Sequence, residues 1–268
     1  MIHEILFPGL GLSFSISKTA FTLFGISVAW YAVLIVLSFI IALFLFYKRD
    51  GLYGISKEHL FELMFYILPI AFIGARAYYV LFRMDYYLQN PDQIFNLRGG
   101  GLAIYGGIIA GAIVCYVFAK KKKIALGDLL DYIVPALALG QAIGRWGNFI
   151  NVEAYGTETT SFLRMGIFEN GIYQEVHPTF LYESIVDFVL FLFLLFYQKK
   201  RKFRGEITYL YLIFYCLARF FIEGIRTDSL MLGNYRISQV LSAIVFVIFC
   251  GLFWKKRKEM KKTEYSKQ

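Results

Sequence analysis

The chain has 268 residues, of which 58% are hydrophobic and only 18% charged, and its formal net charge is +9. The charged fraction is below the roughly 25% of soluble domains, so the composition excludes an ordinary soluble domain and indicates a polytopic membrane protein. Because the basic residues cluster in short segments between apolar runs, we attribute the positive charge to membrane topology and expect no nucleic acid as a partner.

Seven apolar segments approach the about 20 residues that cross a bilayer. They lie at residues 24–47, 60–82, 102–119, 126–144, 180–197, 207–222 and 237–254. Asp128, Asp131 and Pro135 interrupt the fourth segment, which makes it the weakest. The sequence therefore predicts an all-α polytopic membrane protein with seven transmembrane helices, in which residues 1–268 form a single integral membrane domain.

The basic residues predict the orientation of these spans. Four groups of Lys and Arg alternate with the spans so that all lie on one side: Lys48, Arg49 and Lys57; Lys120–Lys123; Lys199–Lys202 and Arg204; and seven residues of the tail 255–268. Positive segments stay in the cytoplasm. We therefore expect the N-terminus outside, the loop 145–179 extracytoplasmic and the C-terminal tail cytoplasmic.

This orientation places polar residues from six spans in one layer, the outer half of the membrane. They are Tyr31, Arg76, Tyr105, Gln141, Arg145, Asn148, Glu183, Asp187, Arg219, Glu223 and Arg226. Ionisable side chains at membrane depth are costly unless they face a protein interior, a wet cavity or a ligand. We expect one site in the outer leaflet.

The densest polar stretch is GRWGNFINVEAYG, residues 144–156, which follows the fourth span. A polar loop that caps a helix is the plainer interpretation, but Trp146 and Phe149 are unusual in a solvated loop. Arginine binds phosphate oxygens with a planar fork and stays charged when dehydrated. Arg145 and Arg219, supported by Arg76, therefore suggest a clamp for a phospholipid headgroup.

Structural roles remain open for several of these residues. Arg219 and Glu223 are four apart and can form an ion pair on one helix face. Glu183 and Asp187 are also four residues apart. Ion pairs with Arg76 would account for these two carboxylates as well as a role in the reaction would. Tyr31 follows Trp30, and such aromatic pairs often belong to an interfacial belt.

Several blocks together resemble the bacterial prolipoprotein diacylglyceryl transferase family. They are WYA at Tyr31, GARAYYVLF at Arg76, GGGLAIYGG, the stretch 144–156, HPTFLYE and ARFFIEGIR, in the family's order and over nearly the whole chain. The resemblance implies a multi-pass enzyme of the bacterial cell membrane, surrounded by membrane lipids. It would transfer diacylglyceryl from phosphatidylglycerol to the lipobox cysteine of an exported prolipoprotein, forming a thioether and releasing glycerol phosphate. By this resemblance, Arg145 and Arg219 hold the headgroup, while Asn148, Glu153, Gly156, Tyr31 and Glu223 shape the site.

One position departs from the family pattern, because family members often carry histidine where this chain has Tyr105. That histidine has been cast as the base that removes the thiol proton, so the base is open here. Tyrosine ordinarily titrates near about pH 10 and is a poor base at neutral pH. Neither the three dispersed cysteines nor the three histidines show metal-ligand spacing, and the chemistry calls for no metal or organic cofactor.

The alternative class is a transporter or flippase for an anionic lipid or solute, which would also use membrane arginines and broken helices. Such a protein should carry polar residues at the midplane and inner side and a two-half repeat. The sequence shows neither, so the transferase is the preferred hypothesis.

Overall fold

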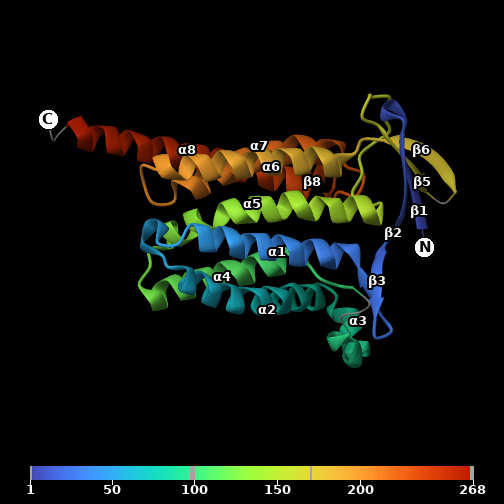
Figure 1. The fold of residues 1–268 in the computed structure, drawn as a ribbon, viewed down its shortest axis with the longest axis horizontal. Helices are drawn as coiled ribbons and strands as arrows, with labels where there is room; N and C mark the ends of the chain where they lie inside the picture. The colour runs from blue at the N-terminus through green and yellow to red at the C-terminus, as the bar shows by residue number, and fades with distance from the viewer. Residues whose placement is uncertain (1, 97–99, 170, 266–268) are drawn as a thin grey trace. The chain divides into compact units, whose positions relative to one another are not determined.

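The computed structural model describes residues 2–96, 100–169 and 171–265, drawn as ribbons in Figure 1. The chain forms two compact units. Residues 1–45 and 133–268 make up the large unit, and residues 46–132 make up the small unit. The boundaries fall inside two helices, α1 (Trp30–Lys48) and α5 (Leu126–Asn151). The prediction of a single domain over residues 1–268 remains a prediction.

Seven helices within the described residues are long and apolar enough to cross a membrane. They are α1 (Trp30–Lys48), α2 (Lys57–Phe82), α4 (Ile104–Lys122), α5 (Leu126–Asn151), α6 (Thr179–Tyr197), α7 (Glu206–Ile225) and α8 (Ile237–Tyr265). Each overlaps one predicted span, so the polytopic membrane class is confirmed. A short helix, α3 (Met84–Gln89), follows α2.

The first span begins later than the sequence suggested. Strands β3 (Thr19–Leu23) and β4 (Ile26–Ala29) form an antiparallel hairpin, so residues 24–29 are not helical. Phe24 and Gly25 at its tip have φ angles of 49° and 77°, as a tight two-residue hairpin turn requires. Tyr31 therefore lies in the first turn of α1, whereas the predicted span 24–47 placed it further from the helix start.

The fourth span ends later than predicted. Helix α5 continues to Asn151, so residues 145–151, which we expected to open the extracytoplasmic loop, form its last two turns. Aromatic packing holds these turns in place. The Trp146 indole N–H donates to Ser184 Oγ at 3.1 Å, and the Phe149 ring stacks on Phe180 at 4.7 Å between centroids. Glycine and polar residues made this segment look like a loop, but its apolar side chains pack against α6.

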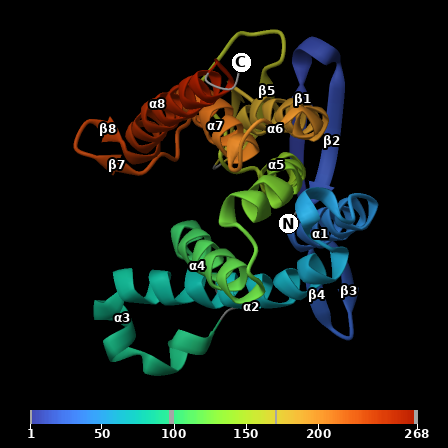
Figure 2. The same cartoon turned by 90° about the vertical axis from the view of Figure 1, so that its left-hand side faces the viewer.

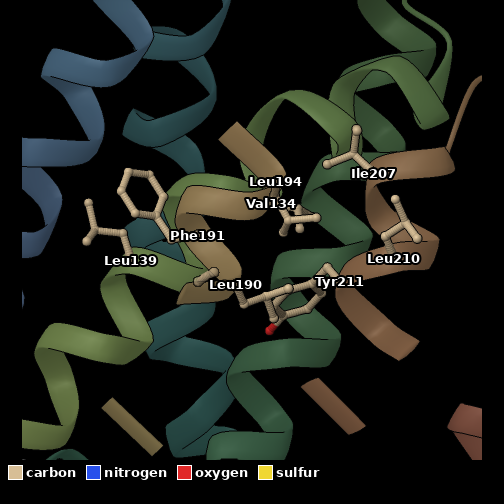
Figure 3. Close-up of a cluster of buried hydrophobic side chains, with 9 residues drawn as sticks. Val134, Leu139, Leu190, Phe191, Leu194, Ile207, Leu210 and Tyr211 are labelled. Atoms are coloured by element: carbon tan, nitrogen blue, oxygen red, sulfur yellow. The ribbon is translucent and has the colours of Figure 1, made fainter. Parts of the chain in front are cut away.

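The core of the large unit is formed by α5, α6 and α7, which lie side by side in Figure 1. Figure 3 shows the cluster at its centre. Its buried members are Val134, Ala138, Leu139, Leu190, Phe191, Leu194, Ile207, Leu210 and Tyr211. Because these side chains recur at helical spacing on each segment, each helix turns one apolar face to the others. This packing fixes the three helices that carry the candidate site.

A four-stranded antiparallel sheet covers one end of these helices (Figure 1). Its order is β2 (Leu12–Ser17), β1 (Ile2–Phe7), β5 (Met165–Glu169) and β6 (Ile172–Val176). Strand β1 pairs with β2 along its length, and Leu6 lies opposite Gly166 of β5. Ile5 and Phe7 share a buried cluster with Phe149 and Phe180, so the sheet packs on the ends of α5 and α6.

In the small unit, α2 and α4 lie side by side (Figure 2). They cross at glycines. A Cβ added to Gly74 would lie 2.4 Å from the Ala110 Cβ, and one added to Gly106 would lie 2.3 Å from the Gly74 carbonyl oxygen. Such small residues let membrane helices approach closely. Gly106 therefore serves helix packing.

Candidate active site

The centre of the candidate site is Glu183, the fifth residue of α6, whose side chain is only 4% exposed. Three arginines contact its carboxylate. Arg145 Nη2 from α5 pairs with Oε2, while Arg219 Nη1 from α7 and Arg226 Nη1 lie 2.8 Å and 3.1 Å from Oε1. Arg219 Nη2 also pairs with Glu223 Oε2, one turn further along α7. We call these five residues the arginine–glutamate cluster.

Two further residues hold the cluster from the C-terminal end of α7. Asp228 receives both a 2.9 Å bond from Arg226 Nε and a 2.8 Å bond from Arg226 Nη2, which is the bidentate geometry of a strong pair. Arg236 Nη1 donates to the carbonyl oxygens of Glu223 and Arg226, the latter at 2.6 Å. The last turn of α7 is therefore fixed by side chains that come from beyond it.

The Arg226–Asp228 pair lies outside the helices and has a defined pH dependence. Burial raises the pKa of the Asp228 carboxyl, but the hydrogen bonds and charge of Arg226 outweigh this effect and hold the pKa below its ordinary value. The pair is thus fully formed above the ordinary pKa of an aspartate. Its stabilisation is lost as the pH falls through the lowered pKa.

Arg145 is the most accessible arginine of the cluster. Its side chain is 20% exposed, against 15% for Arg219 and 9% for Arg226. Its Nη1 makes only a long 3.5 Å contact with Asn148 Oδ1, and its Nε has no acceptor among the described residues. Arg145 therefore keeps donors that an incoming anion can use, and Arg219 and Arg226 keep fewer.

The interior beside the cluster is too small for a lipid headgroup. A cavity of about 10 Å³ lies against Glu183, Asp187, Tyr215 and Arg219. This is about the space that one water needs. Asp187 is 2% exposed and makes no ion pair with a described residue of the large unit. The alternative that pairs Glu183 and Asp187 with Arg76 stays a prediction. A phosphate would have to approach from the open side, where Arg145 lies.

Asn148, Asn151 and Glu153 form a polar bridge from the cluster into the following loop. Glu153 Oε1 accepts hydrogen bonds from Asn148 Nδ2 at 3.0 Å and from Asn151 Nδ2 at 3.2 Å. Asn148 in turn touches Arg145. Glu153 therefore braces both asparagines, and through Asn148 it supports Arg145.

Tyr31 packs against the helix that carries Arg145. A Cβ added to Gly147 would lie 2.2 Å from Tyr31 Cδ2 and 2.6 Å from Cε2, so only glycine fits beneath the ring. Tyr31 is 37% exposed. It therefore braces the turn after Arg145 as well as facing the surroundings, and the aromatic-belt interpretation does not account for this contact.

We expect Gly147→Ala to destabilise the protein and to reduce its activity. The new methyl group overlaps the body of the Tyr31 ring, and overpacking of this kind costs typically about 1–3 kcal/mol. The measurement is the thermal unfolding midpoint of the purified protein together with its transfer rate. Gly144→Ala is the matched control, since a Cβ there meets nothing within 4 Å. If both variants have the unfolding midpoint and the transfer rate of the parent protein, the close contact between Gly147 and Tyr31 does not contribute to stability or activity.

Gly156 is a point of close chain approach. A Cβ there would lie 2.7 Å from the His177 Cβ and 3.1 Å from the Ile225 carbonyl oxygen. Its N–H donates to the His177 carbonyl at 2.9 Å, and the next N–H, of Thr157, donates to Ile225 at 2.8 Å. Gly156 thus joins the start of α6 to the end of α7, and it shapes the site through the backbone.

Arg76 holds a loop of the small unit. Its three guanidinium nitrogens donate five hydrogen bonds of 2.7–3.0 Å to backbone carbonyl oxygens. The acceptors are Gln93, Ile94, Asn96, Gly100 and Gly101. These bonds occupy all three nitrogens, so Arg76 positions this loop. Its support of a phosphate clamp stays a prediction. Gly99, the first glycine of the GGG run, lies outside the described residues.

Tyr105 is the second residue of α4, also in the small unit, and is half-buried.

The structure brings Arg145, Glu183, Arg219 and Glu223 together and adds Arg226 in direct contact with Glu183. Arg226 was predicted in the polar layer without a role, and Asp228 and Arg236 were not predicted. Within the described residues, no group of three or more His, Cys, Asp or Glu side chains is placed to hold a metal ion.

Together these features define a multi-pass membrane protein with a buried arginine–carboxylate site at the ends of α5, α6 and α7. A sequence model of the family described as prolipoprotein diacylglyceryl transferase matches residues 18–255. The chain belongs to this family.

Curated relatives agree with this assignment. A protein of Finegoldia magna is 48% identical over 248 residues, which cover 92% of this chain and 98% of that protein. Relatives from Clostridioides difficile and Bacillus cereus are 46% and 42% identical, with 85% and 89% of this chain and 90% and 94% of theirs covered. All three are named phosphatidylglycerol–prolipoprotein diacylglyceryl transferase.

Proposed function

We propose that this chain transfers the diacylglyceryl group of phosphatidylglycerol to the cysteine thiol of a prolipoprotein lipobox. The acceptor is an exported precursor, and the site of action is the outer leaflet of a bacterial cell membrane. The N-terminus and the loop that follows α5 are extracytoplasmic, and the basic tail is cytoplasmic. The family and the names of its relatives support the reaction, and the distribution of lysine and arginine supports the orientation.

The observation that carries this proposal is the open side of Arg145. Arg219 and Arg226 are largely occupied by Glu183, Glu223 and Asp228, whereas Arg145 keeps unfilled donors beside them. A phosphodiester that binds Arg145 is also attracted by the positive charge of Arg219. The carboxylate of Glu183 holds these guanidinium groups in place before the substrate arrives, so little reorganisation is needed during the reaction.

The reaction breaks an S–H and a C–O bond and forms a C–S bond. The thiol gives its proton to water or to the departing phosphate, and its sulfur attacks the glyceryl carbon that is joined to the phosphate oxygen. A carbon–sulfur bond forms while the carbon–oxygen bond breaks, and its electron pair leaves with glycerol phosphate. The departing phosphate gains negative charge, which arginines already in position stabilise. The same positive field favours the thiolate form of the acceptor cysteine.

The direct test uses purified protein, phosphatidylglycerol vesicles and a synthetic lipobox peptide. We expect the peptide mass to increase by one diacylglyceryl unit on its cysteine, and glycerol phosphate to appear in equal amount. A peptide with serine in place of the cysteine should gain nothing. Transport of the lipid across the vesicle membrane without any change in peptide mass would contradict the proposal and favour a flippase.

We predict that Thr160 faces the outside of the cell and Lys262 the cytoplasm. Both side chains are exposed, and Cys115, Cys216 and Cys250 can be replaced by serine to remove background labelling. In intact cells, an impermeant thiol reagent should label Thr160→Cys. The same reagent should label Lys262→Cys only after the membrane is permeabilised. Labelling of Lys262→Cys alone in intact cells would reverse the orientation.

We predict a modest effect from Tyr105→Phe. If Tyr105 acts as an oriented hydroxyl and not as the base, the change removes one hydrogen bond worth about 0.5–1.5 kcal/mol, and transfer should slow about tenfold or less. The measurement is turnover against pH for Tyr105→Phe and Tyr105→His. If Tyr105→Phe is inactive, and Tyr105→His is active with an additional ionisation near about pH 6.5 in its curve of turnover against pH, position 105 is the base.

A further inference from the structure

A hollow of about 790 Å³ lies over the loop that follows α5. Its lining comes from three segments: Val152–Glu158, the strands β5 and β6 through Glu169, Gln174 and Val176, and Thr227 with Asp228. This volume lies within the about 300–1,000 Å³ that is usual for binding sites of small ligands. It is far larger than the cavity of about 10 Å³ inside the cluster.

The hollow adjoins the arginine–glutamate cluster at two points. Glu153 lines it and also accepts from Asn148, which touches Arg145. Asp228 lines it from the other side and pairs with Arg226, which contacts Glu183. A chain whose reactive atom lies at the cluster can therefore continue directly into the hollow.

The floor of the hollow is preformed. The segment 155–159 is bonded on one side to residues 175–177 and on the other to residues 225–227. Thr159 N–H donates to the Glu175 carbonyl at 3.0 Å, and Thr227 N–H donates to the Tyr155 carbonyl at 3.2 Å. Because backbone bonds hold it on both sides, this surface does not have to order itself when a ligand binds, which favours binding.

The lining of the hollow is acidic although the chain as a whole has a net charge of +9. Glu153, Glu158 and Glu169 pair with no cation in the described part of the chain, and no lysine or arginine is among the lining residues. The Tyr155 hydroxyl donates a hydrogen bond to the Glu169 carboxylate. Burial has the larger effect and this carboxylate the smaller one, and together they raise the pKa of Tyr155 to about 12. The Tyr155 phenol therefore stays neutral and adds no further charge.

We propose that this hollow binds the residues that follow the acceptor cysteine in the polypeptide substrate, and that it prefers lysine or arginine there. The inference rests on the proposed function, because it takes the thiol at the cluster as its starting point. An exported precursor carries an apolar signal segment before its processing site, and this segment belongs in the bilayer. The hollow is formed by segments beyond the helix ends. The residues after the cysteine are thus the part of the substrate that reaches it.

The test compares three lipobox peptides that differ only in the two residues after the cysteine: Lys-Lys, Ser-Ser or Glu-Glu. Each exposed charge pair is expected to change KM about two- to fivefold. With the parent protein KM should be lowest for Lys-Lys, intermediate for Ser-Ser and highest for Glu-Glu. Glu158→Gln and Glu169→Gln should each weaken this order, and the double variant should nearly remove it. Added salt should reduce the preference in the parent protein.

Glu4→Gln is the matched control, because Glu4 is exposed and outside the hollow. It should keep the full preference. Equal KM values for the three peptides with the parent protein would overturn the inference while leaving the proposed function intact, since all three would still be lipidated. A preference that survives in the double variant would overturn it too. If no peptide gains lipid, the proposed function itself has failed.

Discussion

Replacing Arg145 by lysine should reduce the rate of diacylglyceryl transfer at least about 100-fold although the charge is kept. Lysine cannot present two parallel N–H donors to a phosphate, and loss of one well-placed donor costs about 2.7–4 kcal/mol of transition-state stabilisation in comparable sites. Since Arg145 forms one ion pair within the described part of the chain, with Glu183, its replacement should affect rate more than stability. The measurement is the transfer rate per mole of folded protein.

Arg219→Lys provides the comparison. Arg219 contacts both Glu183 and Glu223, so its replacement should lower the rate and also the thermal unfolding midpoint. Arg204→Lys, in the basic segment between α6 and α7, is the control and should behave like the parent protein. Near-normal rates in both cluster variants at normal abundance would show that the arginines are structural and that the phosphate binds elsewhere.

Glu183→Ala should lower the stability of the protein more than Gly147→Ala or either arginine replacement does. Three arginines share this carboxylate, whose side chain is 4% exposed, and removal of one partner from a buried ion pair typically costs about 3–5 kcal/mol. At about 2–4 °C per kcal/mol, the thermal midpoint should fall by roughly 6–20 °C. The measurement is thermal unfolding in detergent, with Glu4→Gln as the exposed control.

A second variant separates stability from chemistry. Glu183→Gln keeps the shape but removes the charge, so the arginines are left with excess positive charge. Added phosphate should then stabilise Glu183→Gln more than it stabilises the parent protein, because an anion bound at the accessible side of Arg145 compensates for the missing negative charge. If Glu183→Ala breaks buried ion pairs, the thermal unfolding midpoint of this variant falls by roughly 6 °C or more. A much smaller fall would show that Glu183 does not organise the arginines.

Hydropathy predicted the helices well because a span needs little more than about 20 apolar residues. It misplaced two ends for different reasons. Residues 24–29 are apolar enough to extend α1, but Phe24 and Gly25 turn the chain back into a hairpin. Residues 145–151 looked like a loop because they are polar and rich in glycine, yet Phe149 and Trp146 pack against α6 and keep them helical.

The site was predicted in part. Placing the spans in one orientation brought Arg145, Glu183, Arg219 and Glu223 to a common depth, because helical rise converts sequence position into depth. Depth alone does not say which residues touch. The contact of Arg226 with Glu183 and the bonds of Arg236 to backbone carbonyls depend on how the chain turns after α7. No local sequence pattern encodes that turn.

The pairing of β1 with β5 has a consequence for how the protein is made. Leu6 and Gly166 are neighbours in the sheet, although most of the chain separates them in sequence. At a synthesis rate of about 5–20 residues per second, the first strands emerge on the order of 10 s before their partner exists. During that interval Ile5 and Phe7, which end up buried, are exposed on an unpaired strand edge. The early chain should therefore depend on a chaperone until its later half arrives.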